Sequence, residues 1–286
     1  MIDPNNFYFY LIFISQILLI SGYIPKTITI RIQTVREKYP VDLYPKLYTK
    51  PIAEHIKMQS QYASANRVLL TIGFSLLSAI IMWDYKTKGD ISQMIPWAYF
   101  MLQMIPLAWL EVKEFKYFKA MRAVNTNTTK TADFQPRKLL DFISPKLLLT
   151  ALALMIVAFA LAIFHLGWSV NAFENMAVIF VTNLFFAGVI YWNIYGKKQD
   201  PHQSSSDRTK VIKITIKSIL LTSIAVSIFL ASQMLINMFQ ADFIEPIIMS
   251  LYCQIIAWGS ILARLNSMKL EDIDFSVYKE QSIEES

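Results

Sequence analysis

The stretch SPKLLLTALALMIVAFALAIFHL, residues 144–166, decides the fold class of this chain. Beyond Lys146 it contains no Asp, Glu, Lys or Arg for 20 residues, and a helix that spans a bilayer needs about 17–25 apolar residues. Ser144 and Pro145 are suited to the N-cap and the first turn of a helix. A soluble core helix would carry a polar stripe, which this stretch lacks. The sequence therefore predicts a membrane-spanning helix over 147–166.

Six further windows have the same apolar character. They are about 7–24, 66–83, 92–110, 175–195, 218–239 and 246–263. The chain of 286 residues is 55% hydrophobic and 17% charged, whereas soluble domains carry about 25% charged residues. We therefore expect an all-α, polytopic integral membrane helix bundle with about seven transmembrane helices. Residues 1–265 would form this single bundle, and 266–286 would form a short acidic tail.

The first window has features of a retained span. It begins close to the start of the chain, but no basic leader precedes it and no small-residue cleavage site follows it. A basic leader and a small-residue cleavage site are typical of a cleaved signal peptide. We therefore expect residues 7–24 to remain in the protein as its first membrane helix.

The basic residues predict an orientation. With seven spans, four segments share one side of the membrane and hold 25 of the 27 Lys and Arg: 25–67, 111–146, 196–217 and 264–286. Basic residues in short loops stay cytoplasmic, so we expect the N-terminus outside and the C-terminus in the cytoplasm, with the bundle in the inner (plasma) membrane of the cell. The net charge of +6 then indicates contact with anionic inner-leaflet lipids. We expect no nucleic-acid partner.

The segment YPVDLYPKLYTKP, residues 39–51, lies on the predicted cytoplasmic side between the first two spans. Its three prolines disfavour helix, so the segment should be extended or turned. Its tyrosines are suited to the headgroup region, where a ring is half buried and its hydroxyl stays wet; they are Tyr39, Tyr44 and Tyr48. We expect an interfacial strap along the inner membrane surface. The alternative is a docking segment for a cytoplasmic partner.

Uncharged amides are the main polar groups inside the predicted spans. Besides Gln16, six of them are candidates for an intramembrane polar lining: Gln103, Asn183, Asn193, Gln233, Asn237 and Gln254. Amides in lipid pair with neighbouring helices, so the alternatives are helix–helix contacts and the lining of a pathway. Gln233 and Asn237 are four residues apart and share a helical face. We expect that face to point into the bundle.

Patterns for catalysis or metal binding are sparse. Cys253 is the only cysteine, so neither an internal disulfide nor a cysteine zinc site is expected. The three histidines are divided between the two sides of the membrane: His55, His165 and His202. We therefore expect no shared metal site and no cofactor. A weak cluster on the outer face contains His165, Asn171 and Glu174, either as a small site with a His–Glu pair or as an interfacial cap with capping-box spacing.

These features favour a non-enzymatic multi-pass inner-membrane protein. It would act as a scaffold, sensor or accessory subunit through its basic cytoplasmic face, with a cytoplasmic or membrane protein as its partner. The alternative is a small transporter or channel subunit lined by the intramembrane Asn and Gln. A lipid-modifying enzyme is a third hypothesis, but no paired carboxylates or histidines support it. Solute flux across liposomes that contain the purified protein would separate the first two.

Overall fold

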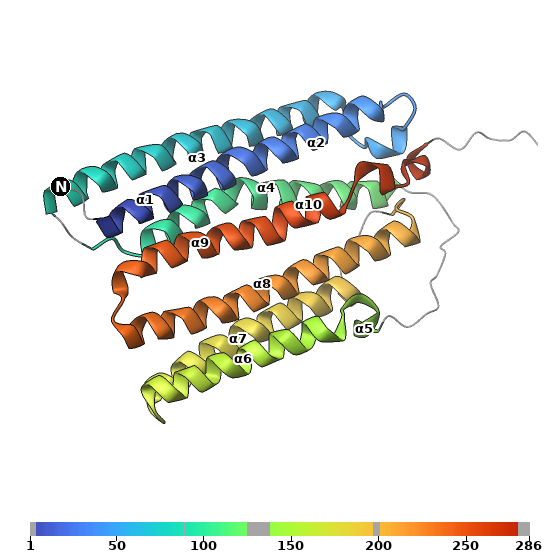
Figure 1. Ribbon diagram of the computed structural model, residues 1–286. Coiled ribbons are helices and arrows are strands. Elements are labelled where there is room, and N and C mark those ends of the chain that lie inside the picture. The colour runs from blue at the N-terminus through green and yellow to red at the C-terminus, as the bar shows by residue number, and fades with distance from the viewer. Residues whose placement is uncertain (1–3, 88–89, 125–137, 197–200, 280–286) are drawn as a thin grey trace, which may run out of the picture.

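The computed structural model describes residues 4–87, 90–124, 138–196 and 201–279. Within these ranges the chain is almost entirely helical and contains no strand, which confirms the all-α prediction. The long helices run side by side along a common direction (Figure 1). Ser144 occupies the N-cap position of the helix that begins at Pro145, as the sequence predicts, but its side chain makes no capping hydrogen bond.

A first group of helices contains both ends of the described chain. It consists of α1 (Pro4–Gln16), α2 (Ile24–Lys38), α3 (Ile52–Thr87), α4 (Met94–Val124), α9 (Glu245–Ala257) and α10 (Ala263–Ser267). The π-helical segment η1 (Ile17–Tyr23) joins α1 to α2, and the π-helical segment η5 (Trp258–Leu262) joins α9 to α10. Each joined pair therefore forms one continuous helix. Between these helices lies a core of buried aliphatic and aromatic side chains, which includes Phe9, Phe13, Ile20, Tyr62, Leu77, Tyr99 and Cys253.

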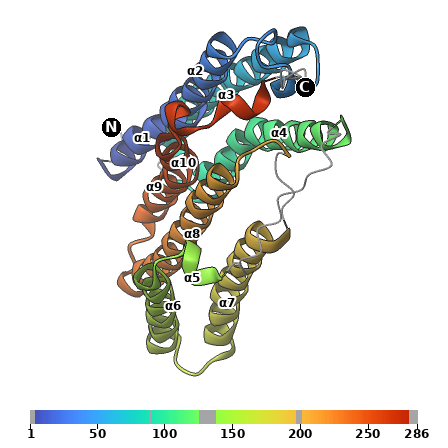
Figure 2. The same cartoon turned by 90° about the vertical axis from the view of Figure 1, so that its right-hand side faces the viewer.

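The second group consists of α5 (Leu139–Phe142), α6 (Pro145–Leu166), α7 (Val170–Tyr191) and α8 (Ser205–Phe239), with a π-helical segment η3 (Trp192–Gly196) after α7. Ala158 and Ala162 of α6 are fully buried in a cluster with Ile179 of α7 and Met234 of α8. Small residues four apart let helices approach closely in a membrane. Figure 2 shows this group set off from the first, with α8 and α9 in contact between them.

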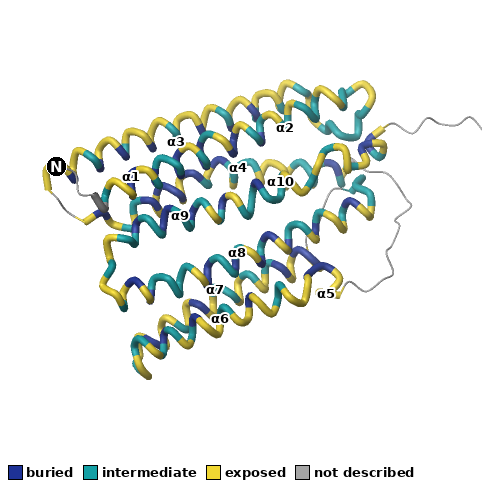
Figure 3. Tube along the Cα trace, viewed as in Figure 1, coloured by how far each residue is buried: buried dark blue, intermediate teal, exposed yellow. Residues whose placement is uncertain are grey.

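The outward faces of the bundle are apolar and exposed, most extensively on α3, α6 and α7 (Figure 3). Phe164 is 76% exposed and Leu149 is 65% exposed, which is expected for side chains that face lipid. Among the described residues, six helical stretches are long and apolar enough to cross a membrane: Asn6–Lys38, Ile52–Thr87, Pro145–Leu166, Val170–Gly196, Ser205–Phe239 and Asp242–Ser267. Helices that satisfy their own backbone hydrogen bonds are one of the two structures that can span lipid. The architecture is that of an integral multi-pass membrane protein.

Helix α4 contains most of the predicted span 92–110, from Met94 on, but is not among these six. Its apolar half is diluted by Pro96, Gln103 and Pro106, and its other half is rich in Lys and Glu. The helix is nevertheless 31 residues long and packs against both α3 and α9. Six spans thus follow from apolar length, and the seventh stays a prediction.

The described parts of the four basic segments meet at one end of the bundle, which we call the basic end. Figure 1 shows there the α2–α3 connection, the end of α4, the start of α8 and the last described residues. The opposite end holds the start of α1, the end of α3, the α6–α7 turn and the start of α9. Helix α3, with 36 residues, is about 54 Å long. It is therefore longer than the roughly 30 Å hydrocarbon core of a bilayer.

Candidate functional site

A group of polar side chains is buried in the middle of the first helix group. It contains Gln16, Ser21, Tyr99, Gln103 and Ser250, and we call it the central polar cluster. None of the five is more than 4% exposed. They come from α1, η1, α4 and α9, so the cluster joins helices that are far apart in the sequence.

Both amide hydrogens of Gln16 have acceptors. Its Nε2 donates to the carbonyl oxygen of Pro96 at 3.1 Å and to Oε1 of Gln103 at 3.2 Å. Its Oε1 accepts a hydrogen bond from the hydroxyl of Ser250 at 2.7 Å. One side chain of α1 thus holds α4 on one side and α9 on the other. Unpaired amides in lipid would cost several kcal/mol, which this arrangement avoids.

The cluster continues from Gln103 to α3. Nε2 of Gln103 donates to the hydroxyl of Ser21 at 2.9 Å, and Ser21 lies 3.3 Å from the hydroxyl of Tyr99. The hydroxyl of Tyr99 donates to the carbonyl oxygen of Leu69 at 2.8 Å. The five-residue spacing of the π-helical turn η1 puts Gln16 and Ser21 on the same side of their helix. The local widening of the helix is therefore part of the cluster.

Gly73 makes the approach of Tyr99 to α3 feasible. A Cβ atom at Gly73 would lie 2.2 Å from the hydroxyl oxygen of Tyr99 and 2.7 Å from its Cζ atom. Only a residue without a side chain leaves room for this ring against the helix backbone. Gly73 therefore lets Tyr99 reach the carbonyl of Leu69.

Gln254 forms a second contact between α9 and α1. Its Nε2 donates to the carbonyl oxygen of Ile12 at 3.1 Å, and its Oε1 accepts from the hydroxyl of Ser15 at 3.0 Å. Ser250 lies 3.5 Å from the same carbonyl of Ile12. Of the six predicted lining residues, Gln103 and Gln254 therefore both form hydrogen bonds with α1.

The other four amides lie in the second helix group and are not brought together. Asn183 joins α7 to α8, because its Oδ1 accepts from the hydroxyl of Ser223 at 2.6 Å. Asn193 donates to the carbonyl of Val189 in its own helical turn at 2.8 Å. Gln233 is half-buried and its Nε2 has no partner among the described residues. Asn237 is exposed, so the expected inward face of α8 includes Gln233 and excludes Asn237.

At the opposite end of the bundle a carboxylate is buried. Asp84, near the end of α3, is 3% exposed. It accepts a hydrogen bond from the hydroxyl of Tyr10 at 2.6 Å and another from Nδ2 of Asn6 at 2.9 Å. The contact fixes the first turns of α1 against α3. Asp84 was expected to lie outside the spans, and the sequence offers no sign of its burial.

The predicted cluster of His165, Asn171 and Glu174 is loose. His165 is half-buried, Asn171 and Glu174 are exposed, and no hydrogen bond or ion pair among the described residues joins the three. The predicted capping role of Asn171 is wrong. Ser169 caps α7 instead, because its hydroxyl accepts from the backbone N–H of Ala172 at 3.3 Å.

Two of the three tyrosines of the predicted strap lie at the basic end in a packed cluster, which we call the aromatic cap. It contains Tyr39, Tyr44, Tyr117, Met121, Phe275 and Tyr278. The ring of Tyr39 stacks on that of Phe275 with a centroid distance of 3.8 Å and an interplanar angle of 17°. The ring of Tyr44 meets Tyr39 edge to face at 5.1 Å. The strap is turned, with a short 3₁₀ helix η2 (Pro45–Leu47), as the prolines predict.

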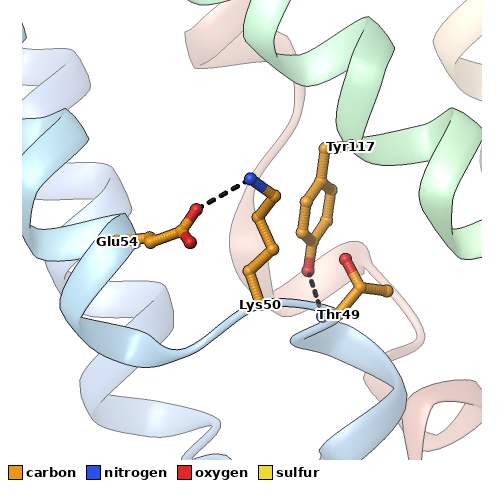
Figure 4. A network of polar contacts seen from close by, with 4 residues as sticks. All are labelled: Thr49, Lys50, Glu54 and Tyr117. Atoms are coloured by element: carbon orange, nitrogen blue, oxygen red, sulfur yellow. Dashed lines mark hydrogen bonds and ion pairs between the residues drawn. The ribbon is translucent and has the colours of Figure 1, made fainter.

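Tyr117 of α4 fastens the end of the strap. Its hydroxyl accepts from the backbone N–H of Thr49 at 3.2 Å and donates to the carbonyl oxygen of Leu47 (Figure 4). Beside it, Lys50 and Glu54 form an exposed ion pair of 2.7 Å. Exposed pairs of this kind contribute little to stability, because solvent screens them. The tyrosine, rather than the ion pair, fixes the strap to α4.

Tyr48 closes the strap on itself. Its hydroxyl donates to the carbonyl oxygen of Tyr39 at 2.6 Å. Burial raises the pKa of Tyr48, the nearby Tyr117 raises it further, and Arg36 opposes the shift. Tyr48 therefore keeps its proton, which the hydrogen bond to Tyr39 requires.

Several residues of the central polar cluster and of the aromatic cap were not among the candidate residues that the sequence suggested. Ser21, Tyr99 and Ser250 carry hydroxyls in otherwise apolar spans, and the joining role of Gln16 depends on its partners in other helices. In the aromatic cap, Phe275 and Tyr278 belong to the segment expected to be an acidic tail. Their spacing of three residues within that segment is the one signal that could have marked them.

No protein-family model matches this chain, and no curated protein or solved structure is significantly similar to it.

Proposed function

We propose that this chain is a non-enzymatic protein of the inner (plasma) membrane that works as a scaffold, sensor or accessory subunit through its basic, cytoplasmic end. In this proposal α4 is a seventh span, the N-terminus lies outside and the C-terminus lies in the cytoplasm. The distribution of Lys and Arg supports the orientation. The observation that carries the proposal is the aromatic cap, because it orders the strap, the end of α4 and the last described residues into one surface.

The central polar cluster supports this function over transport. Gln16 donates its amide hydrogens to Gln103 and to the backbone carbonyl of Pro96. Gln103 donates to the hydroxyl of Ser21 and to the backbone carbonyl of Gln16. A polar group that lines a pathway must be free to exchange its partner for a solute or water. The cluster instead resembles the interhelical hydrogen bonds that hold membrane bundles together.

A photo-cross-linking amino acid at two exposed positions tests the function. Leu43 is 62% exposed in the strap, and Leu149 is 65% exposed on the apolar face of α6. With the cross-linker at Leu43, we expect an adduct with one defined cytoplasmic or membrane protein in cells. A cross-linker placed in that protein should in turn give an adduct with this chain. Adducts with lipid alone are expected from Leu149. A strap that yields no protein adduct would contradict the proposal.

The transporter alternative rests on one observation, the unpaired Nε2 of Gln233. A buried donor without an acceptor costs about 1–3 kcal/mol, and a solute could satisfy it. Purified protein in sealed vesicles distinguishes the two functions. Solute flux that is abolished by Gln233→Leu in a stably inserted protein would favour transport.

A further inference from the structure

The last described residues of the chain pack against the basic end. The surface that they cover, which we call the groove, is formed by the strap, by Tyr117, Phe118 and Met121 of α4, and by Val35 of α2. Residues 268–279, which we call the tail segment, place two aromatic side chains on this surface. Phe275 is 8% exposed and Tyr278 is 6% exposed. Ser276 between them is exposed, and the three-residue spacing puts both rings on one face of their 3₁₀ turn.

A buried carboxylate fixes the backbone of the tail segment. Asp207, in the first turn of α8, is 5% exposed, and its Oδ2 accepts a hydrogen bond from the backbone N–H of Asp274 at 3.0 Å. The hydroxyl of Ser204 accepts a hydrogen bond from the backbone N–H of Asp207 at 3.2 Å. A hydrogen bond to an ionised acceptor is about twice as strong as a neutral one. The basic end therefore supplies a backbone hydrogen bond at the residue directly before the first of the two aromatic contacts.

The tail segment has little structure of its own. It consists of two short 3₁₀ turns, η6 (Leu270–Asp272) and η7 (Phe275–Tyr278). Such turns are not stable in isolation, so the groove is what orders them. Where the segment begins, Arg31 of α2 donates to the carbonyl oxygens of Leu265 and Met268. The segment beyond Met268 can therefore leave the groove while α10 stays anchored.

The tail segment and the segments of the basic end carry net charges of opposite sign. The tail segment has Glu271, Asp272 and Asp274 against Lys269 and Lys279, a net charge of −1, whereas Lys and Arg predominate in the segments that form the basic end. Lys279 lies 5.6 Å above the ring of Tyr44, where a cation is attracted to the aromatic face. The occupant that suits this groove is an acidic segment with two aromatic residues three positions apart.

We propose that the groove is a peptide-binding site in which the tail segment is the resident, exchangeable occupant. Its exchange partner is an acidic peptide of a protein partner with aromatic residues at positions i and i+3. The inference rests on the proposed function, since it names the surface through which the basic end engages a partner. While the tail segment is bound, the site is closed to that partner.

Binding of a synthetic peptide tests the exchange. The probe is a fluorescent peptide with the sequence of residues 268–279, MKLEDIDFSVYK. Its targets are the full chain in lipid nanodiscs and the full chain with Phe275→Ala and Tyr278→Ala, in which the tail segment is released. We expect the variant to bind the peptide at least about tenfold more tightly than the unchanged chain does. A peptide that lacks both aromatic rings should bind the variant at least about tenfold more weakly.

A second measurement leaves the groove and both aromatic residues unchanged. A fluorophore on Ser276→Cys reports the mobility of the tail segment, and Cys253 is only 1% exposed, so labelling is specific. Excess unlabelled peptide should displace the tail segment and lower the anisotropy of the fluorophore. The matched control for the aromatic substitutions is Phe243→Ala, at the opposite end of the bundle, which should leave peptide binding unchanged.

Two results would overturn the exchange. One is equal peptide affinity, or no binding, for the unchanged chain and the released variant. The other is an anisotropy that saturating peptide does not change, because the tail segment would then be a fixed part of the fold. These outcomes are independent of the cross-linking experiment at Leu43. A partner found there without peptide exchange would retain the proposed function and reject this inference alone.

Discussion

Single residues in this chain determine how closely its helices pack. Gly73 leaves the space into which the ring of Tyr99 fits, and Gln16 connects three helices with one amide. Both effects depend on contacts between residues that are more than 20 positions apart. In lipid, where apolar side chains gain little by leaving the solvent, close packing and interhelical hydrogen bonds are the main forces of association.

The substitution Gly73→Ala should lower the free energy of unfolding by about 1–3 kcal/mol, because overpacking forces the ring of Tyr99 to move. Unfolding of the purified protein in mixed micelles measures the change. Adding Tyr99→Phe removes the atom at 2.2 Å but leaves Cζ at 2.7 Å, so it should restore part of the loss. Gly188→Ala is the control, since nothing lies within 4 Å of its Cβ position. Equal effects at the two glycines would contradict the close contact.

The substitution Gln16→Leu should lower the free energy of unfolding by about 2 kcal/mol. It removes three hydrogen bonds, so that Oε1 of Gln103 loses its donor from Gln16 and the hydroxyl of Ser250 loses its acceptor on Gln16. Asn237→Leu, at an exposed position, should change it by less than about 0.5 kcal/mol. The same unfolding assay compares the two. If Asn237→Leu were the more costly, the assignment of the interior polar contacts would be wrong.

The sequence could predict that amides would pair but could not predict the partners. Gln103 was identified because it interrupts an apolar window, and its contacts with Gln16 and Ser21 require the packing of α1 against α4. Asp84 was placed outside the membrane because it follows the apolar window directly. Its burial depends on Tyr10, which is 74 residues away in the sequence.

At the scale of elements, the main departures from regular structure are the π-helical segments and the strap. η1 interrupts the first long helix where Gln16 and Ser21 enter the central polar cluster. Prolines and glycines mark turns in a sequence, but the stretch ILLISGY gives no comparable sign of a π-helical turn. The strap was predictable as a turned segment from its prolines. Its contact with the tail segment was not, because it depends on residues more than 200 positions away.

The strap should be protected from hydrogen exchange by the tail segment. The backbone N–H groups of Tyr44, Leu47 and Tyr48 are bonded within the strap at 3.0–3.1 Å, and Phe275 covers Tyr39. Phe275→Ala should therefore speed exchange over residues 40–48 by about tenfold, because local opening becomes easier. Mass spectrometry of exchanged peptides measures this. Unchanged exchange in the variant would show that the strap is ordered without the tail segment.

At the scale of the whole molecule, the composition sufficed to predict a helical membrane bundle. The windows 147–166 and 175–195 fall within helices that are long and apolar enough to span a bilayer. The window 92–110 is less decisive, because Pro96, Gln103 and Pro106 reduce its apolar character. Whether α4 crosses the membrane decides the side on which every later segment lies. The orientation and the proposed role of the basic end both depend on this crossing.

The side of the membrane on which the residues before and after α4 lie tests this account most directly. Single cysteines at Asp90 and Leu140, both exposed, can be treated in intact cells with a maleimide that does not cross the membrane. We predict that Asp90→Cys is labelled in intact cells, and that Leu140→Cys is labelled only after the membrane is made permeable. Labelling of both in intact cells would show that α4 does not cross, and the reverse pattern would show that the basic end faces outward.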